Sequence, residues 1–296
     1  MKEAILYLHD ECNYSCNYCL LNQSWYTRQI PSLAWTDQGM AAITSFFAGW
    51  KIMLTGGEPA FHPCFLELAK ENLLRLDTNN SLSLAKWQKF VQLVTPDRVD
   101  WIHCSLHPVD LANLPPWLKK LKFIMDAGYR VWVSWVGVSE VLAGLPELKR
   151  SFAQAGIPFV VNLLRTDKYP GAYTAAERQL IDNCSASALQ RAMLDTNLRT
   201  SQGRPYPAGQ RRIQVNAITG SIYRCFRDNQ VMGNIYSGNP ITLSVNPEPC
   251  PYQGCSYFLE HHLDTEGLFQ RDLANILAGN LKFDHDLYQE FLRAAL

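Results

Sequence analysis

The segment that decides the fold lies near the start of the chain and reads Cys12-Asn13-Tyr14-Ser15-Cys16-Asn17-Tyr18-Cys19. Three thiols in one short loop can hold three corners of an iron–sulfur cluster, because such clusters are bound by cysteine thiolates. A cubane cluster has four irons, so three protein ligands leave one iron open to another molecule. A structural zinc site usually takes four closed ligands in paired Cys-x-x-Cys spacing, and here a nearby fourth ligand is missing. The segment therefore predicts a reactive iron–sulfur centre.

The cysteine loop follows the first of six predicted strand–helix units. Apolar runs predict strands at residues 4–8, 51–54, 73–76, 101–106, 130–136 and 158–164. Apolar residues at helical spacing predict helices at residues 36–50, 84–93, 116–127 and 145–155. Nearly continuous apolar strands are typical of parallel sheets covered by helices. The sequence therefore predicts an α/β fold, a partial (β/α)6 barrel of the TIM type.

Three motifs follow the first three predicted strands. They are the cysteine loop, the sequence Gly56-Gly57-Glu58-Pro59, and the pair Thr78-Asn79. In parallel α/β folds the ligand binds at the carboxyl ends of the strands, so we expect the three motifs to share one mouth. Thr78 and Asn79 are expected either to contact cofactor or substrate there, or only to form the turn that their side chains favour.

The cysteine spacing and the Gly-Gly-Glu-Pro sequence together resemble the radical S-adenosylmethionine (radical SAM) superfamily. In that family Cys-x-x-x-Cys-x-aromatic-Cys holds a [4Fe–4S] cluster, and Tyr18 stands at the aromatic position. The resemblance covers roughly residues 4–165. It implies that Cys12, Cys16 and Cys19 bind the cluster, whose open iron chelates S-adenosylmethionine. Reductive cleavage would then give methionine and a 5′-deoxyadenosyl radical, which takes a hydrogen atom from the substrate.

The same resemblance suggests the cofactor contacts. It implies backbone at Gly56 and Gly57 close to the methionine moiety, Glu58 or the adjacent backbone at its amino group, and Tyr18 near the adenine. Polar residues at the ends of the fourth to sixth strands are further candidates, because in the family such residues contact the ribose and the carboxylate. These candidates are Ser105, Ser134, Asn162 and Arg165. Each is equally well explained as a core polar group with internal hydrogen bonds.

The pattern changes after about residue 165. A helix is predicted at residues 175–198, a Gly- and Pro-rich loop at 203–209, a hairpin at 213–225 turning at Thr219-Gly220, and helical structure at 265–296. We therefore expect a core at residues 1–170, a helical linker at 171–211, and a small C-terminal α+β domain at 212–296.

This C-terminal region resembles the auxiliary-cluster extension of SPASM and twitch radical SAM enzymes. The resemblance implies a second [4Fe–4S] cluster on Cys225, Cys250 and Cys255. Its fourth corner is either bound by Cys184 or open to substrate. The region departs from the family because no cysteine lies between residues 199 and 223, and too few cysteines remain for two auxiliary clusters. Structural thiols or a small zinc site are the alternatives.

A free thiol near the radical can also return a hydrogen atom to a substrate radical. Cys104, Cys184 and Cys225 are the alternative candidates for this catalytic role. Cys64 is interpreted as an ordinary buried thiol, because free cysteine packs as a small hydrophobe.

Composition narrows the function classes. Lys+Arg and Asp+Glu both number 27, so no basic surplus indicates a nucleic-acid partner. An odd count of 9 cysteines favours metal or catalytic use over disulfides. No apolar stretch is long enough to span a bilayer, and the N-terminus lacks a signal-peptide core. We expect a cytoplasmic protein with no membrane contact.

The sequence thus predicts a radical SAM enzyme, an oxidoreductase or an isomerase. Its substrate is expected to be a small molecule or a short peptide, since only eleven residues precede Cys12 and leave no room for a leader-peptide domain. Epimerisation and dehydrogenation both fit, and an electron donor such as flavodoxin or ferredoxin is expected. One alternative is a non-catalytic iron–sulfur or metal-binding electron-transfer protein, which would not need the Gly-Gly-Glu-Pro turn. Another is a nucleic-acid-modifying radical SAM enzyme.

Overall fold

The computed structural model describes residues 2–19, 36–164, 171–185, 187–196, 202–225, 227–228, 230–238, 241–252, 266–278 and 283–295. The chain divides into two compact units. The first comprises Met1–Cys104, Lys119–Arg130 and Ala208–Pro247, and the second comprises Ser105–Leu118, Val131–Pro207 and Glu248–Leu296. The predicted boundaries at residues 170 and 211 stay a prediction, and residues that follow the expected linker join the first sheet.

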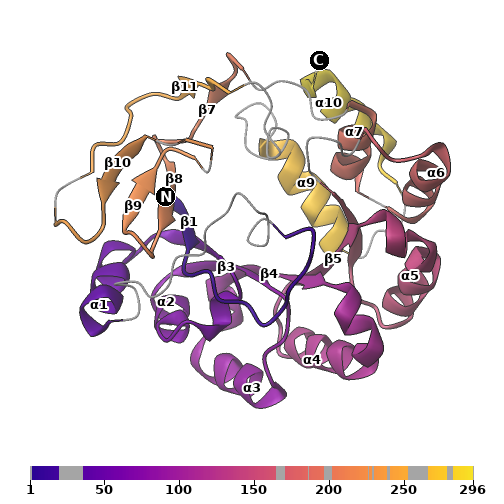
Figure 1. Ribbon diagram of the computed structural model, residues 1–296, viewed down its shortest axis with the longest axis horizontal. Helices are drawn as coiled ribbons and strands as arrows, with labels where there is room; N and C mark the ends of the chain where they lie inside the picture. The colour runs from indigo at the N-terminus through magenta and orange to yellow at the C-terminus, as the bar shows by residue number, and fades with distance from the viewer. Residues whose placement is uncertain are drawn as a thin grey trace. The chain divides into compact units, whose positions relative to one another are not determined.

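The first unit is built on a largely parallel sheet. Its strands are β1 (Glu3–Tyr7), β2 (Lys51–Thr55), β3 (Leu73–Thr78), β4 (Val99–Leu106), β8 (Arg212–Asn216), β9 (Ser221–Tyr223) and β10 (Val231–Asn234). They lie in the order β10-β9-β8-β1-β2-β3-β4, and Figure 1 labels all of them except β2. Strands β8, β1, β2, β3 and β4 pair in parallel, while β9 and β10 are antiparallel. The predicted hairpin is confirmed as β8–β9, and its first strand pairs with β1.

Helices cover one face of this sheet. They are α1 (Asp37–Phe46), α2 (Phe65–Glu71), α3 (Leu84–Leu93) and α4 (Leu114–Asp126). Only the part of α4 from Lys119 onward belongs to this unit. Alternate strand residues such as Leu6, Ile52 and Leu74 are fully buried on that face, as are Trp87 and Phe90 of α3. Burial of each such side chain is worth roughly 1.5–3 kcal/mol, so this layer fixes the strands and the loops that leave them.

The second unit contains two parallel strands and most of the C-terminal helices. The strands are β5 (Val131–Gly137) and β6 (Phe159–Leu163), and a small ribbon pairs β7 (Pro205–Tyr206) with β11 (Glu248–Pro249). The helices are α5 (Leu145–Gln154), α6 (Ala175–Cys184), α7 (Ala188–Thr196), α9 (Glu266–Leu277) and α10 (His285–Ala295) (Figure 1). Of the short 3-10 turns, η3 (Pro59–Phe61) and η4 (Pro96–Arg98) belong to the first unit, and η5 (Pro108–Asn113) and η6 (Ser139–Gly144) belong to the second.

The predicted α/β fold is confirmed, with a strand at each of the six predicted positions. One predicted helix needs correction. The helix expected at 175–198 is two helices, and the Asp272 carboxylate caps the second by accepting from Ser187 Oγ at 2.6 Å and Ala188 N at 2.8 Å. The predicted helical structure at 265–296 is confirmed in its described part, which contains α9 and α10. Within the described ranges, no helix combines the length and apolar composition needed to cross a bilayer.

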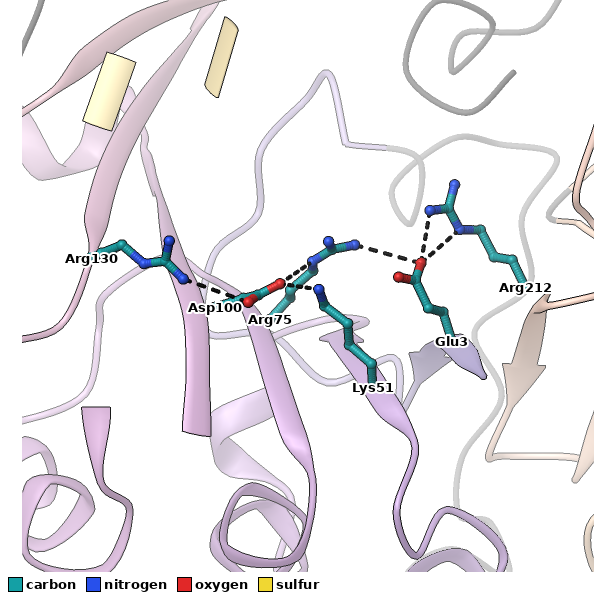
Figure 2. A network of polar contacts seen from close by, with 6 residues as sticks. All are labelled: Glu3, Lys51, Arg75, Asp100, Arg130 and Arg212. Atoms are coloured by element: carbon teal, nitrogen blue, oxygen red, sulfur yellow. Dashed lines mark hydrogen bonds and ion pairs between the residues drawn. The ribbon is translucent and has the colours of Figure 1, made fainter. Parts of the chain in front are cut away.

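Ion pairs link the starts of the strands in the first unit. Figure 2 shows the Asp100 carboxylate of β4 with Lys51 and Arg75 on one side and Arg130 on the other, and Arg75 reaching on toward Glu3. Glu3 also accepts from Arg212 at 2.8 Å, which ties β8 to β1. Burial alone would raise the pKa of Asp100, but Lys51 and Arg75 outweigh it and hold that pKa below its usual value. The network lies at the amino ends of the strands and leaves their carboxyl ends for other chemistry.

Replacing Asp100 by asparagine should destabilise the protein by about 1–3 kcal/mol at pH 7. Arg75 and Lys51 are only 13% and 18% exposed, so removal of their shared carboxylate leaves two poorly hydrated cations. Urea unfolding measures the loss. The matched control is Asp126→Asn, which breaks an exposed pair with Lys122 and should cost no more than about 0.5 kcal/mol. Because the pKa of Asp100 is lowered in the folded state, its contribution is present above the unfolded pKa and is lost on acidification. Equal losses in the two variants would contradict the network's role.

Candidate active site

The three sequence motifs meet at the carboxyl ends of β1, β2 and β3. The loop after β1 accepts hydrogen bonds from the Gly-Gly-Glu turn after β2, from Gly57 N to His9 O and from Glu58 N to Glu11 O, both at 2.7 Å. The segment after β3 reaches the same loop, since Asn79 Nδ2 donates to Asn13 Oδ1 at 2.9 Å. Adjacent parallel strands bring their carboxyl ends to one edge, which is why segments almost 70 residues apart in sequence come together.

The two glycines of the turn are required by protein backbone. A Cβ on Gly57 would lie 2.0 Å from Glu11 O, and a Cβ on Gly56 would lie 2.7 Å from His9 O. Gly56 also has φ of +141°, a region that side chains strongly disfavour. These glycines therefore allow the turn to approach the backbone of the loop before Cys12. The sequence predicts that they allow an approach to the cofactor instead. Their contact with the methionine moiety stays a prediction.

Glu58 links the ends of β2 and β3. Its carboxylate is fully buried and accepts from Thr78 Oγ1 at 2.8 Å, Asn79 N at 2.7 Å and Ala60 N at 3.2 Å. Burial raises the pKa of Glu58 to about 7, although these three hydrogen bonds act in the opposite direction. The side chain has no exposed surface. The contact of Glu58 or the adjacent backbone with the amino group of the cofactor stays a prediction.

The segment after β3 forms a fixed turn, one of the two roles expected of Thr78 and Asn79. Asn79 Oδ1 accepts from Ser81 N at 2.9 Å, and Asn80 adopts a left-handed φ of 56°. Sequence reasoning missed two residues that hold this turn. Trp87 Nε1 donates to Asn80 Oδ1 at 2.9 Å, and Lys120 donates to the carbonyl oxygen of Asn80. The Asn-Asn pair signals such a turn, whereas nothing local in the sequence points to Lys120.

The cysteine loop exposes its three thiols only in part. Cys19 N donates to Cys16 O at 3.1 Å, which closes a turn that includes the partly exposed Tyr18. Cys12 Sγ accepts from Tyr14 N at 3.4 Å and from Asn79 Nδ2 at 3.7 Å. Burial raises the pKa of the Cys12 thiol, and these two N–H donors oppose the rise because they stabilise the thiolate.

The chemistry of this donor set fits an iron–sulfur cluster. Soft thiolates select iron–sulfur clusters or zinc, and N–H donors to a thiolate sulfur are common around such clusters. No three Cys, His, Asp or Glu side chains converge to metal-binding distance in the part of the chain that the structure describes. Closure of the three thiols around a cluster therefore stays a prediction.

The remaining cofactor candidates belong to the second unit or lie outside the described residues. Ser134 of β5 is buried, while Ser105 of β4 and Asn162 of β6 are partly exposed. Asn162 Oδ1 is buried and finds no hydrogen-bond partner among the described residues, as a group awaiting a ligand would be. Arg165 lies outside the described residues. Their contact with the cofactor stays a prediction.

Two thiols near the motifs are deeply buried. Cys104 has no exposed surface and alternates along β4 with the partly exposed His103 and Ser105, so it faces the helix-covered side. Burial raises the pKa of the Cys104 thiol well above its usual value. Cys64 is confirmed as a buried thiol, with its Sγ 2.8 Å from His62 Nδ1, and burial raises its pKa to about 12. The role of Cys104 as a hydrogen-atom donor stays a prediction.

The four cysteines predicted for a second cluster are distributed between the units. Cys225 follows β9 in the first unit and is partly exposed, while Cys184 at the end of α6 and Cys250 after β11 are buried in the second. Cys255 lies outside the described residues. The ligand set of the second cluster therefore stays a prediction.

Comparison with known proteins gives one short sequence match and several structural matches. No family model matches the chain. A GTP 3′,8-cyclase of Actinobacillus succinogenes is 34% identical over 74 residues, which are 24% of this chain and 22% of the cyclase. Streptococcus suis SuiB superposes with a TM-score of 0.54 at 16% identity, over 80% of this chain and 64% of SuiB. The anSMEcpe structure with bound S-adenosylmethionine also gives 0.54, at 13% identity, over 79% of this chain and 75% of that one.

SuiB and anSMEcpe are radical SAM enzymes. The chain shares the fold of these two enzymes. The predicted resemblance is thereby confirmed at the level of fold, and the motifs after β1 and β2 occupy the strand ends expected for it. The chain spans about two thirds of SuiB and less than a quarter of the cyclase. The SPASM- or twitch-like assignment of the C-terminal region stays a prediction.

Proposed function

We propose that this protein is a radical SAM enzyme in which Cys12, Cys16 and Cys19 hold a [4Fe–4S] cluster. The observation that carries the proposal is the pair of 2.7 Å backbone hydrogen bonds between the Gly-Gly-Glu turn and the loop before Cys12. These hydrogen bonds join the loop that carries Cys12 to the Gly-Gly-Glu turn, which supports a single site formed by the two motifs. When bound and reduced, the cluster supplies the electron that cleaves S-adenosylmethionine, and the resulting 5′-deoxyadenosyl radical takes a hydrogen atom from the substrate.

The turn contributes to cofactor binding through its backbone. The Glu58 side chain accepts three internal hydrogen bonds and has no exposed surface. The amino group of S-adenosylmethionine is therefore proposed to bind the main chain next to Glu58. Glu58 itself keeps the ends of β2 and β3 in register. Tyr18, beside Cys19 and partly exposed, is proposed to lie near the adenine.

The substrate is proposed to be a short peptide or a small molecule. Two solved structures with this fold support the peptide, since SuiB is seen with the precursor peptide SuiA and anSMEcpe with the Kp18Cys peptide. Two outcomes fit the substrate radical. In epimerisation a thiol that does not bind a cluster returns a hydrogen atom, and the alternative candidates are Cys104, Cys184 and Cys225. In dehydrogenation the radical loses an electron and a proton. A low-potential donor such as flavodoxin or ferredoxin would supply the first electron.

A second [4Fe–4S] cluster is proposed on Cys225, Cys250 and Cys255, with Cys184 as the candidate fourth ligand. Burial raises the pKa of the Cys225 thiol, and the backbone N–H groups of Arg227 and Asp228 oppose that rise, as N–H donors do around cluster thiolates. The same local pattern occurs at Cys12 with Tyr14 N. Such a cluster would accept the electron that dehydrogenation releases.

Counting iron separates the two clusters. After anaerobic reconstitution, wild type should hold about eight irons per chain and the triple variant Cys12→Ala, Cys16→Ala, Cys19→Ala about four, because the second set of thiols is untouched. Iron and sulfide assays with electron paramagnetic resonance make the measurement. A triple variant that holds no iron–sulfur cluster would remove the second-cluster proposal, and one that holds as much iron as wild type would remove the first.

Deuterium tracing tests the proposed reaction. Candidate peptides and small molecules deuterated at their reactive carbons should transfer deuterium to 5′-deoxyadenosine. In D₂O an epimerase should place solvent deuterium in its product through an exchanged thiol, whereas a dehydrogenase should form a product two mass units lighter than the unlabelled substrate. The two rival classes predict other results. An electron-transfer protein would form no 5′-deoxyadenosine, and a nucleic-acid-modifying enzyme would take deuterium only from RNA or DNA.

A further inference from the structure

The side chain of Asn79, at the end of β3, donates a hydrogen bond to one of the three cysteines proposed to hold the first cluster. Its Nδ2 lies 3.7 Å from Cys12 Sγ and 2.9 Å from Asn13 Oδ1. The side-chain oxygen of Asn79 accepts from Ser81 N at 2.9 Å. Because a backbone N–H can only donate, this contact fixes which end of the amide is oxygen and directs the NH₂ group to Cys12.

The donor is held in place independently of Cys12. Asn79 is only 6% exposed, and its backbone N donates to Glu58 Oε2 at 2.7 Å. The loop on the other side is held by the same residue, since Glu58 N donates to Glu11 O at 2.7 Å, one position before Cys12. Glu58 therefore holds both partners of the Asn79–Cys12 contact. Its carboxylate binds the backbone of Asn79, and its backbone N–H binds the loop that carries Cys12.

We propose that Asn79 is a positioning residue for the first cluster, which orients the Cys12 thiolate and raises the reduction potential of the cluster through an N–H···S hydrogen bond. This inference rests on the proposed function, because it assumes that Cys12 binds iron. Reduction adds negative charge to the cluster and its sulfurs, and an N–H donor stabilises that charge, so each such bond favours the reduced form. Tyr14 N gives Cys12 a second donor at 3.4 Å.

Two substitutions separate this role from the turn that Asn79 also forms. Asn79→Asp keeps an oxygen to accept from Ser81 N but has no N–H for sulfur. Asn79→Ser keeps a shorter acceptor for the turn, is neutral, and cannot reach Cys12. The matched control is Ser81→Ala, which removes the 3.1 Å hydrogen bond from Ser81 Oγ to Asn13 and leaves the backbone N that orients Asn79.

The experiment is a redox titration of the reconstituted full-length protein, monitored by electron paramagnetic resonance without S-adenosylmethionine. Both Asn79 variants should shift the potential of the first cluster in the negative direction, while Ser81→Ala should match wild type. Resonance Raman spectra should show stronger iron–thiolate bonds in both Asn79 variants. Loss of iron loading in the Asn79 variants alone, with wild-type circular dichroism of the apoproteins, would support the positioning role.

Wild-type loading together with an unchanged potential in both Asn79 variants would overturn the proposal. This unchanged potential is distinguishable from failure of the proposed function. A wild-type protein that binds the cluster but forms no 5′-deoxyadenosine would contradict radical SAM activity, and the potential shift would still report on the hydrogen bond to Cys12.

Discussion

Replacing Gly57 by alanine is expected to destabilise the protein by roughly 3 kcal/mol and to abolish loading of the first cluster. The new Cβ would lie 2.0 Å from Glu11 O, 2.4 Å from Glu11 C and 2.9 Å from Asp10 C. All three atoms are backbone, so no side chain can rotate away. The turn and the cysteine loop must separate, and the two 2.7 Å hydrogen bonds between them are lost.

Chemical denaturation and iron analysis measure the two effects of Gly57→Ala. The control is Gly267→Ala in α9, where an added Cβ meets nothing within 4 Å and alanine is the better helix former. Its stability should be unchanged or higher by up to about 1 kcal/mol. A Gly57→Ala protein with wild-type stability and wild-type iron content would show that the two loops do not depend on each other.

Replacing Glu58 by glutamine should change how the stability of the apoprotein depends on pH. Burial raises the pKa of Glu58 from 4.5 to about 7, so between these values the folded state binds more protons than the unfolded state. Its stabilising contribution is therefore complete below pH 4.5 and is lost as pH rises through 7. From pH 5 to pH 8, wild type should lose about 2.5 kcal/mol relative to Glu58→Gln.

Urea unfolding of both proteins at the two pH values makes this comparison. Glutamine keeps the shape of the side chain but places an NH₂ group against donors, so the variant should itself be weaker by roughly 1–3 kcal/mol at pH 5. The exposed Glu67→Gln on α2 is the control, and its unfolding free energy should stay within about 0.5 kcal/mol of wild type at both pH values. A constant difference between wild type and Glu58→Gln would contradict the raised pKa.

The sequence predicted the strands and the order of the motifs because both are local signals. Apolar runs mark β1 to β6, and parallel strands necessarily bring the loop at Cys12 and the turn at Gly57 to one edge. The short helix α2 was missed because its seven residues, after Pro63, are too few to show a period. The break between α6 and α7 depends on a cap from Asp272, 85 residues beyond Ser187.

The contacts that define the site could not be read from sequence for a physical reason. The residue types at Glu58 and Asn79 suggest ligand contacts, but their partners depend on which strands are neighbours and how deeply each side chain is buried. Glu58 thus serves as an internal acceptor and Asn79 as a donor to Cys12. The position of β8 beside β1 is similarly non-local, since it depends on parallel pairing and on the Glu3–Arg212 ion pair.

Formation of 5′-deoxyadenosine tests the central claim most directly. The protein is reconstituted anaerobically with iron and sulfide, reduced with dithionite, and incubated with S-adenosylmethionine. Chromatography with mass detection should find 5′-deoxyadenosine and methionine in equal amounts from wild type. Neither product should form from the triple Cys12, Cys16, Cys19→Ala variant. A wild-type protein that is fully loaded with iron and forms no 5′-deoxyadenosine would contradict the account.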